Sequence, residues 1–370
     1  MLRPQEQDDA AAEVGRGEGA PAPDLTDLLR RALRSAASDV ILSADSAPAL
    51  RIHGQITLDG RTPLAAATVR KMIYGVLRDD QVARLEAELE LDFSFTLDGR
   101  HRFRGNAFFQ RQAVGAVFRL IPDSIPEIEI LNLPPVIEEF ALAAQGLVLV
   151  TGPAGHGKST TQAAMIHRIN RKRRAHIITV EDPVEFVHTN AQSVIEQREV
   201  GLDTKSFADA LRHVLRETPD VILVGEMRDA ESIACALTAA ETGHLVLATL
   251  HTNDCVQAID RIVDPFPAAQ QNQVRGQLSM CLLGVISQRL LPRADGKGRV
   301  PAVEVLRNTT GVSHLIRDGR TPQVYAMMET HAKDGMRTMD AALKDLCLRG
   351  LITYDEAAGR MRNPAMLDRA

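Results

Sequence analysis

The chain has 370 residues, of which 45% are hydrophobic and 25% charged, so it is long and apolar enough to form two or three domains with buried cores. Its 43 basic and 48 acidic side chains give a formal net charge of −5, and only 4% of its residues are aromatic, which argues against a nucleic-acid-binding protein. The four cysteines lie far apart in the sequence, which excludes a tetrathiolate zinc site and a dense disulfide scaffold and favours a reducing compartment.

The sequence also lacks the signals of membrane insertion and of export. No apolar run reaches the ~18 residues that a bilayer-spanning helix needs. The acidic N-terminus has no apolar stretch of the kind found in secretory signals. We therefore expect a cytoplasmic protein without a transmembrane segment.

The N-terminal third of the chain has the pattern of a small α+β domain. Residues 1–23 are rich in Ala, Gly, Pro and acidic residues without an apolar period, which predicts a disordered lead-in. A helix is expected from Leu25, with Asp24 or Thr26 as its N-cap. The segments that follow predict a mostly antiparallel sheet within a domain over residues 24–120. The expected strands are 38–43, 50–54, 55–58, 91–96, 102–109 and 113–120, and a second helix covers 67–89.

A proline-rich segment separates this domain from the rest of the chain. Residues 121–135 contain four prolines, and proline interrupts both helices and strand ladders. We predict that this segment is a linker.

The remaining residues, 136–370, have the pattern of an α/β domain. Short, fully apolar runs alternate with helical stretches, which is typical of a parallel sheet covered by helices on both faces. The region from about residue 300 to 370 is predicted to be mostly helical. The apolar runs are Leu147–Thr151, Ile177–Val180, Val221–Val224 and Leu245–Leu250.

A phosphate-binding loop follows the first of these runs and matches the pattern GxxxxGK[ST]. Glycines let successive backbone N–H groups point at phosphate oxygens, and the N-terminus of the next helix adds partial positive charge. Lys158 is expected to reach the β- and γ-phosphates of ATP, and the Ser159 hydroxyl to ligate Mg²⁺. The alternative, a glycine-rich turn that only caps a helix, leaves the Lys and Ser in register unexplained. The residues expected to bind the nucleotide are Gly152, Pro153, Ala154, Gly155, His156, Gly157, Lys158, Ser159 and Thr160.

Acids and histidines follow the other apolar runs. Parallel sheets bind ligands beyond the carboxyl ends of their strands, so these side chains would lie near the loop if their strands are its neighbours. An acid there can hold Mg²⁺ or orient the attacking water, and a histidine can sense a phosphate oxygen. Each could instead be a strand-end cap. Glu226 stands where an Asp for Mg²⁺ is common, so we expect it to hold the metal, through water.

Together these segments resemble the secretion-type hexameric ATPases, and within them the type IV pilus retraction ATPases, the PilT family. The resemblance covers roughly residues 25–360. It is carried by the phosphate loop and by ITVEDPVEFVH (178–188), DVILVGEMRD (220–229) and TGHLVLATLHTND (242–254).

The resemblance implies a PAS-like N-terminal domain, a RecA-like C-terminal domain and a ring of six chains, with ATP between the two domains and beside a neighbouring subunit. It also implies that Glu185 polarises the attacking water, that Glu226 is the second-strand acid, and that His244 and His251 sense phosphate. Domain motion would exert force on a platform protein of the inner membrane. The protein would therefore work at the inner face of the cytoplasmic membrane.

The first domain carries a run of arginines without an acid between residues 100 and 119. Arg104 and Arg119 match positions that the family uses as arginine fingers, which stabilise charge on the transferred phosphate across an interface. Arginine suits this role because its fork binds phosphate and keeps its charge. The alternative is a solvated strand face.

The chain has no four-cysteine zinc insertion and no extra N-terminal domain, which favours the retraction branch of the family. Two departures concern the family's AIRNLIRE motif, aligned with 311–318, and its SDLHLS strand, where Ile41 replaces the histidine. Alternatives therefore stay open: an accessory retraction-type ATPase, a motor of another pilus or secretion system, or a nucleotide-gated structural ring with little hydrolysis. A related accessory ATPase is a further candidate partner. The negative net charge disfavours a RecA-like DNA motor.

Overall fold

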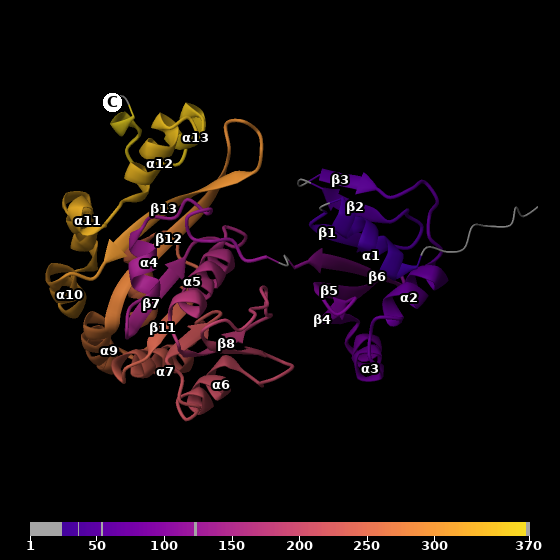
Figure 1. Ribbon diagram of the computed structural model, residues 1–370, viewed down its shortest axis with the longest axis horizontal. Coiled ribbons are helices and arrows are strands. Elements are labelled where there is room, and N and C mark those ends of the chain that lie inside the picture. The colour runs from indigo at the N-terminus through magenta and orange to yellow at the C-terminus, as the bar shows by residue number, and fades with distance from the viewer. Residues whose placement is uncertain (1–23, 36, 53–54, 122–123, 368–370) are drawn as a thin grey trace, which may run out of the picture. The chain divides into compact units, whose positions relative to one another are not determined.

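The computed structural model describes residues 24–35, 37–52, 55–121 and 124–367. The chain divides into two compact units, Met1–Ile121 and Pro122–Ala370, which are described separately below (Figure 1). The division falls at the start of the proline-rich segment. The predicted disordered lead-in over residues 1–23 lies outside the described residues.

The first unit is an antiparallel sheet with helices, as predicted for this part of the chain. The order of its strands is β3-β2-β1-β6-β5-β4, and each neighbouring pair is antiparallel. The elements are α1 (Leu25–Arg34), β1 (Asp39–Leu42), β2 (Ala49–Ile52), β3 (Gln55–Leu58), α2 (Ala66–Tyr74), α3 (Asp79–Glu88), β4 (Glu90–Leu97), β5 (His101–Gln110) and β6 (Ala113–Leu120).

The single helix expected over residues 67–89 is wrong, because two helices occupy this segment. Helix α2 ends at Tyr74, and α3 begins at Asp79. The second helix has its own start signal, since the Gln81 side chain accepts the backbone N–H of Arg78 at 3.0 Å. One apolar period ran through both helices and hid the break.

Alternation along the strands divides this sheet into a buried and an exposed face. Val40, Phe103 and Phe118 point inward and pack with the leucines of α1 in one core. Their neighbours in sequence point outward, so that Arg104 and Arg119 lie directly opposite each other on the outer face of β5 and β6.

The second unit contains a seven-stranded sheet in the order β13-β12-β7-β11-β10-β8-β9. All neighbouring pairs are parallel except β12–β13, so the predicted mostly parallel sheet is confirmed. The elements are α4 (Val136–Ala141), β7 (Gly146–Thr151), α5 (Lys158–Lys172), β8 (His176–Glu181), β9 (Val194–Glu199), α6 (Phe207–Val214), β10 (Val221–Val224), α7 (Ala230–Glu241), β11 (Leu245–Leu250), α8 (Cys255–Val263), α9 (Ala268–Cys281), β12 (Leu282–Pro292), β13 (Arg299–Arg307), α10 (Thr310–Arg317), α11 (Val324–Thr330), α12 (Met339–Leu348) and α13 (Tyr354–Ala358).

The helical C-terminal part begins later than expected. Residues 299–307 form strand β13, and the first helix after it starts at Thr310. From there to Leu367 the described chain is helical with short connections, three of them containing single 3-10 turns.

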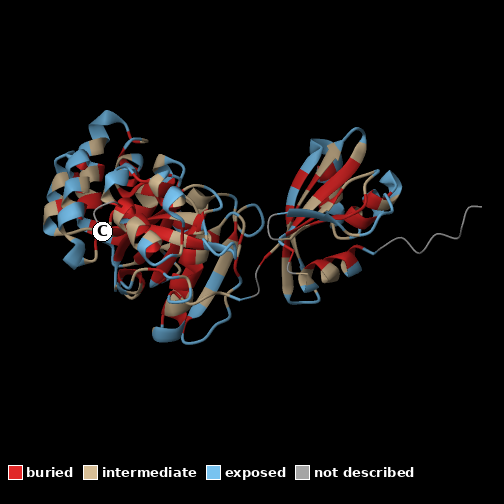
Figure 2. Cartoon of the chain, turned by 90° about the horizontal axis from the view of Figure 1, so that it is seen from above, coloured by how far each residue is buried: buried red, intermediate tan, exposed pale blue. Residues whose placement is uncertain are grey.

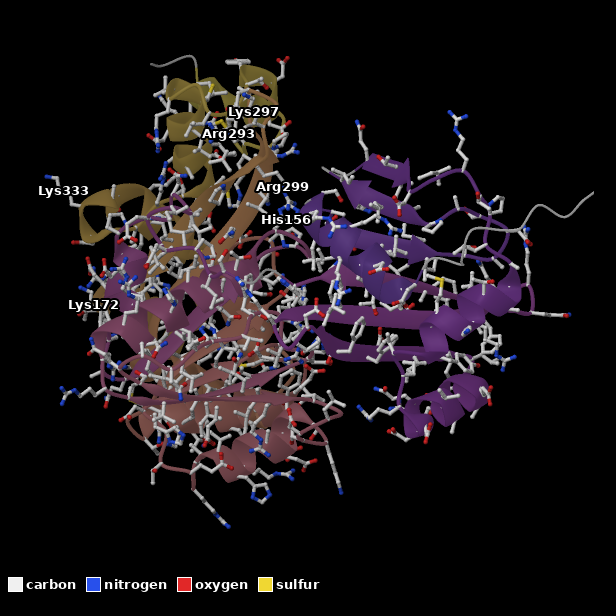
Figure 3. All side chains as sticks on the ribbon, turned by 45° about the vertical axis from the view of Figure 1, so that its right-hand side comes forward. His156, Lys172, Arg293, Lys297, Arg299 and Lys333 are labelled. Atoms are coloured by element: carbon white, nitrogen blue, oxygen red, sulfur yellow. The ribbon has the colours of Figure 1, made fainter. Side chains whose placement is uncertain are left out.

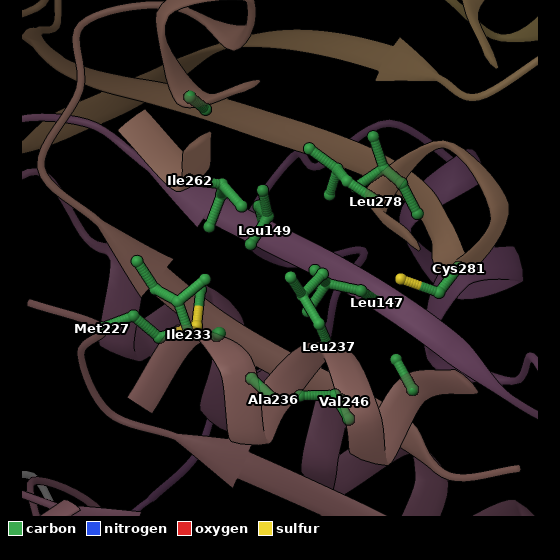
Figure 4. Close-up of a cluster of buried hydrophobic side chains, with 14 of the residues drawn as sticks. Leu147, Leu149, Met227, Ile233, Ala236, Leu237, Val246, Ile262, Leu278 and Cys281 are labelled. Carbon is green, nitrogen blue, oxygen red and sulfur yellow. The ribbon is translucent and has the colours of Figure 1, made fainter. Parts of the chain in front are cut away.

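The central strands of the sheet in the second unit are buried on both faces. Leu147 and Leu149 of β7 pack against α7, α8 and α9, as Figure 4 shows. Val148 and Val150, which point the other way, pack against α4 and α5. Figure 2 shows buried residues gathered in the interior of this unit and exposed residues on its outer helices. This two-sided burial explains why the strands appear in the sequence as continuous apolar runs. No helix in the described parts of the chain is long and apolar enough to cross a bilayer.

Candidate nucleotide-binding site

The phosphate loop lies between β7 and α5, and its glycines are required by its backbone. Gly152, Gly155 and Gly157 have φ of 140°, 75° and 86°, values that residues with a side chain rarely adopt. A Cβ atom at Gly152 would lie 2.3 Å from the backbone oxygen of Gln288, and one at Gly157 would lie 2.7 Å from the Nε2 of the same residue. The loop is therefore pressed against β12 and turns its remaining side toward the site.

Gln288 braces this loop from β12. Its buried side chain accepts a hydrogen bond from the Thr161 hydroxyl at 2.7 Å and donates one to the backbone oxygen of His156 at 2.9 Å. The backbone N–H of Leu290 donates to His156 Nδ1 at 3.0 Å, so this ring is held by the sheet. Sequence analysis missed Gln288, because one glutamine in an apolar segment carries no signal of its own.

The hairpin of β12 and β13 also brings positive charge to the loop. Arg299 lies near His156 in Figure 3, and its guanidinium donates to the backbone oxygen of Gly155 at 3.4 Å. Partial burial lowers the pKa of His156, and the positive charges of Arg299 and Lys158 lower it further. His156 is therefore a neutral part of the loop at physiological pH.

Lys158 opens α5 and lies at the mouth of the loop. Its ammonium donates to the backbone oxygens of Gly152 at 2.8 Å and of Pro153 at 3.0 Å, and it lies 3.4 Å from His251 Nδ1. Burial lowers the pKa of Lys158, while the negative charges of Glu226 and Glu185 oppose this effect. The loop thus holds a largely buried cation whose carbonyl partners a phosphate group can replace.

The strand order brings the predicted side chains to this edge of the sheet. β11 pairs with β7, β10 with β11 and β8 with β10, all in parallel, so their carboxyl ends lie on the same side. His251 follows β11, and its Nε2 lies 3.3 Å from Glu226 Oε1. Glu226 follows β10, and its other oxygen accepts a hydrogen bond from Arg228 at 2.7 Å. Lys158, His251 and Glu226 therefore form one chain of contacts.

The charge state of Glu226 follows from these contacts. Burial raises its pKa, but the hydrogen bond and the positive charge of Arg228, together with the contact to His251, outweigh this effect, so the pKa lies below its usual value. Glu226 is therefore ionised, as a metal ligand must be.

Glu181, the last residue of β8, and Glu185, in the segment that follows it, border the same cavity. Glu181 accepts hydrogen bonds from the Thr179 hydroxyl at 2.7 Å and from Gln197 at 3.1 Å. Burial raises the pKa of Glu181, and the backbone N–H of Glu185 also bonds its carboxylate. Glu181 thereby holds the backbone that carries Glu185.

One cavity collects most of the predicted site residues, and its lining includes Ala154, Gly155, Lys158, Ser159, Glu185, Glu226 and His251. Ser159 and Thr160 lie in the first turn of α5. Two further lining residues, Gln162 and His188, carry buried nitrogen atoms, Nε2 and Nδ1, without a hydrogen-bond partner. Burial lowers the pKa of His188 to about 4, with a smaller effect from His167. Sequence analysis did not single out either residue.

His244 is not brought to this cavity. His244 precedes β11, whereas His251 follows it. The two histidines therefore lie at opposite ends of this strand, roughly 20 Å apart at ~3.3 Å per residue. His244 Nδ1 instead lies 2.9 Å from the backbone oxygen of Ala239 and 3.2 Å from the Thr242 hydroxyl, at the end of α7.

The two predicted arginine fingers belong to the first unit. Arg119 donates to Asp39 at 2.8 Å, and Asp39 is buried. Arg104 lies 4.0 Å from Asp92 and keeps a 42% exposed side chain. The two arginines lie opposite each other on one face of β5 and β6, each beside an acid of the adjoining strand.

The residues present fit a magnesium nucleotide. No group of three or more His, Cys, Asp or Glu side chains in the described residues could hold a metal ion. Ser159 and Glu226 both line the cavity, and Mg²⁺ is usually held by one or two protein groups together with substrate phosphates and water.

The fold and this site define a P-loop nucleoside triphosphatase. The chain belongs to the family of type II/IV secretion system proteins, whose model matches residues 22–344. It is 46% identical over 341 residues to the type IV pilus retraction ATPase PilT of Pseudomonas aeruginosa, with 92% of this chain and 99% of that protein covered. It is 42% identical over 330 residues to the type IV pilus ATPase PilU of the same organism, with coverage of 89% and 86%.

Solved structures agree with these relatives. A crystal structure of the pilus retraction motor PilT with bound ADP has a TM-score of 0.87 and 47% identity, and covers 94% of this chain and all of that one. The ATPase DotB of Legionella pneumophila has a TM-score of 0.79 at 25% identity, with coverage of 95% and 98%. These likenesses confirm the predicted family and the α/β fold.

Proposed function

We propose that the protein is an ATP-hydrolysing motor that powers type IV pilus retraction and thereby twitching motility. The similarity to PilT extends over both units, and the site carries the groups that hydrolysis needs. The observation that carries the proposal is the chain of contacts from Lys158 through His251 to Glu226, in one cavity with Glu185.

In this proposal the phosphate loop and Lys158 bind the β- and γ-phosphates of ATP. Ser159 and Glu226 would hold Mg²⁺, which would supply positive charge to neutralise the charge that develops on the phosphates. Glu185 accepts a hydrogen bond from the attacking water, orients it toward the γ-phosphorus and takes up its proton. His251 lies between Lys158 and Glu226, so a γ-phosphate that attracts Lys158 changes the contacts of this ring and reports nucleotide state.

The proposed working form is a ring of six identical chains. Arg104 and Arg119 act from the first unit on a nucleotide at an interface, where their charge stabilises the leaving phosphate. The ring exerts force on a platform protein at the inner face of the cytoplasmic membrane. The structure gives His244 no place in the nucleotide cavity, so we leave it out of the proposed catalytic set.

The motor is tested by comparing wild type with Lys158→Ala and Glu185→Gln in steady-state ATPase and in binding of a fluorescent ATP analogue. Lys158→Ala should lose binding. Glu185→Gln should bind ATP normally and hydrolyse it at least a hundredfold more slowly, because binding depends on the loop and chemistry on the acid. Equal, near-zero turnover in all three proteins would instead indicate a nucleotide-gated ring.

The biological role is tested by deleting the gene in its host. A hyperpiliated cell that does not twitch supports retraction. The likeness to PilU keeps an accessory role as the second candidate. A deletion strain that still retracts pili, and loses force only under load, would favour that role.

A further inference from the structure

The loop that carries His251 is anchored on both sides. We call residues 251–254 the histidine loop. On the side of β7, Thr252 donates its backbone N–H to the Thr151 hydroxyl at 2.9 Å, and the two hydroxyls lie 2.6 Å apart. At its far end, Asp254 caps α8 by accepting the backbone N–H of Gln257 at 2.8 Å. The loop therefore has little freedom of its own.

The second anchor of Asp254 comes from the C-terminal end of the chain. Arg362 donates a hydrogen bond to Asp254 Oδ2 at 2.6 Å. Asp254 is buried, with 6% of its surface exposed. The guanidinium of Arg362 also lies 4.5 Å from the centre of the Tyr325 ring, a cation–π contact that fixes its plane. One side chain thus links the histidine loop to α11.

The backbone of Arg362 is itself fixed. The N–H groups of Arg362 and Asn363 donate to the two carboxylate oxygens of Asp340, each at 2.9 Å, and Asp340 is buried at the start of α12. The guanidinium therefore extends from a backbone held by α12 to the carboxylate of Asp254. The Arg362 side chain is 53% exposed, but the interaction differs from a pair of two exposed side chains, because Asp254 is buried and the backbone of Arg362 is held.

Glu304 of β13 provides a parallel connection. Its carboxylate accepts the backbone N–H of Cys255, the first residue of α8, at 2.7 Å and that of Met339, the first residue of α12, at 3.0 Å. Helix α12 is thus joined to this region at two points, to Asp254 of the histidine loop through Arg362 and to Cys255 at the start of α8 through Glu304.

We propose that Arg362 is a positioning residue for His251 and couples the C-terminal helices to the nucleotide site. This inference depends on the proposed ATPase function. His251 lies three residues before Asp254, and a contact set at 3.3–3.4 Å to Glu226 and Lys158 is lost when the ring shifts by well under 1 Å. Arg362 lies beyond residue 344, where the family match ends.

The test is a double-substitution cycle on kcat and KM for ATP with Arg362→Ala, His251→Ala and the double variant. Arg362→Ala should lower kcat about tenfold and leave KM within twofold. If Arg362 acts through His251, the double variant should be no slower than His251→Ala alone. Arg362→Lys should recover only part of kcat, because lysine keeps the charge but loses the fork and the ring contact.

Arg349→Ala is the matched control. Arg349 follows α12, its side chain is 52% exposed, and among its described contacts it pairs with Asp345 of the same helix at 3.5 Å. It should keep wild-type kcat. Wild-type kcat in Arg362→Ala, or losses that multiply in the double variant, would overturn the proposal. If the wild-type protein hydrolyses no ATP, the proposed ATPase function is refuted. This outcome differs from failure of the proposed role of Arg362, in which wild type and Arg362→Ala hydrolyse ATP equally fast.

A measurement on hydrogen exchange covers the case in which Arg362→Ala does not fold. In wild type, a non-hydrolysable ATP analogue should slow exchange of the amides of Arg362 and Asn363, because the Arg362 side chain connects them to the site through Asp254. The same analogue should have no such effect in His251→Ala. Equal protection in both proteins, or none in wild type despite bound analogue, would overturn the coupling.

Discussion

Replacing Glu304 tests whether a buried carboxylate joins the helical C-terminal part to the nucleotide site. Its side chain is 1% exposed, and its two oxygens accept separate backbone N–H groups. A hydrogen bond to a charged group contributes about 1.5–3 kcal/mol. Glu304→Gln keeps one acceptor and turns an NH₂ group toward the other N–H, so we expect the free energy of unfolding to fall by about 2 kcal/mol.

Glu304→Ala removes both acceptors and leaves two buried N–H groups unpaired, so its loss should be about twice as large. For a unit the size of Pro122–Ala370, a loss of about 2 kcal/mol corresponds to a drop in Tm of roughly 4–8 °C. Thermal and urea unfolding without nucleotide measure both values. Glu329→Gln is the control, because Glu329 is exposed and its replacement should change stability by less than about 0.5 kcal/mol.

A Glu304→Gln protein with the Tm of wild type would refute this reasoning. It would mean that the carboxylate is not the acceptor for both helix starts. The same variant should also lower kcat, because the connection to the histidine loop is weakened.

Two further predictions concern pH and the phosphate loop. The pKa of His188 is about 4 in the folded protein, below its usual 6.5, so only the unfolded chain takes up this proton between those values. The free energy of unfolding should therefore fall by about 2 kcal/mol between pH 7.5 and 5 because of this residue. Denaturant curves of His188→Gln should lack that part of the loss. Parallel profiles of stability against pH for wild type and His188→Gln would contradict the prediction. Gly157→Ala, with φ of 86° and a neighbour at 2.7 Å, should weaken binding of a fluorescent ATP analogue at least tenfold. Gly155→Ala should lose less affinity for the analogue, because Gly155 has φ of 75° but no neighbour within 4 Å of an added Cβ. A larger loss of affinity in Gly155→Ala than in Gly157→Ala would count against the role of β12.

The strands that sequence analysis predicted in the second unit are those buried on both faces. Their apolar runs result from that burial, so the pattern and its cause coincide. Strand β9 was missed because it lies at the edge of the sheet and its sequence, VIEQRE, is largely polar. Strands β12 and β13 were missed because β12 continues directly from α9, where an apolar segment fits helix or strand equally well. The Asp295-Gly296 pair between them was the available signal of a hairpin.

The candidate site shows the same distinction between local and distant information. Glycines, Lys158 and the acids after strands could be found, since their chemistry is visible in a few adjacent residues. His244 and His251 lie in one sequence box, yet the strand between them separates them across the sheet.

The hairpin of β12 and β13 explains why the rest could not be predicted. Gln288 on β12 braces the phosphate loop, and Glu304 on β13 holds the start of α8 behind the histidine loop. These contacts join residues 132 and 49 positions apart. No local pattern records such pairs, because each depends on the strand order that places β12 beside β7. The two sides of the nucleotide site are thus fixed by one hairpin, so a disturbance of β13 at Glu304 should reach catalysis without touching the nucleotide.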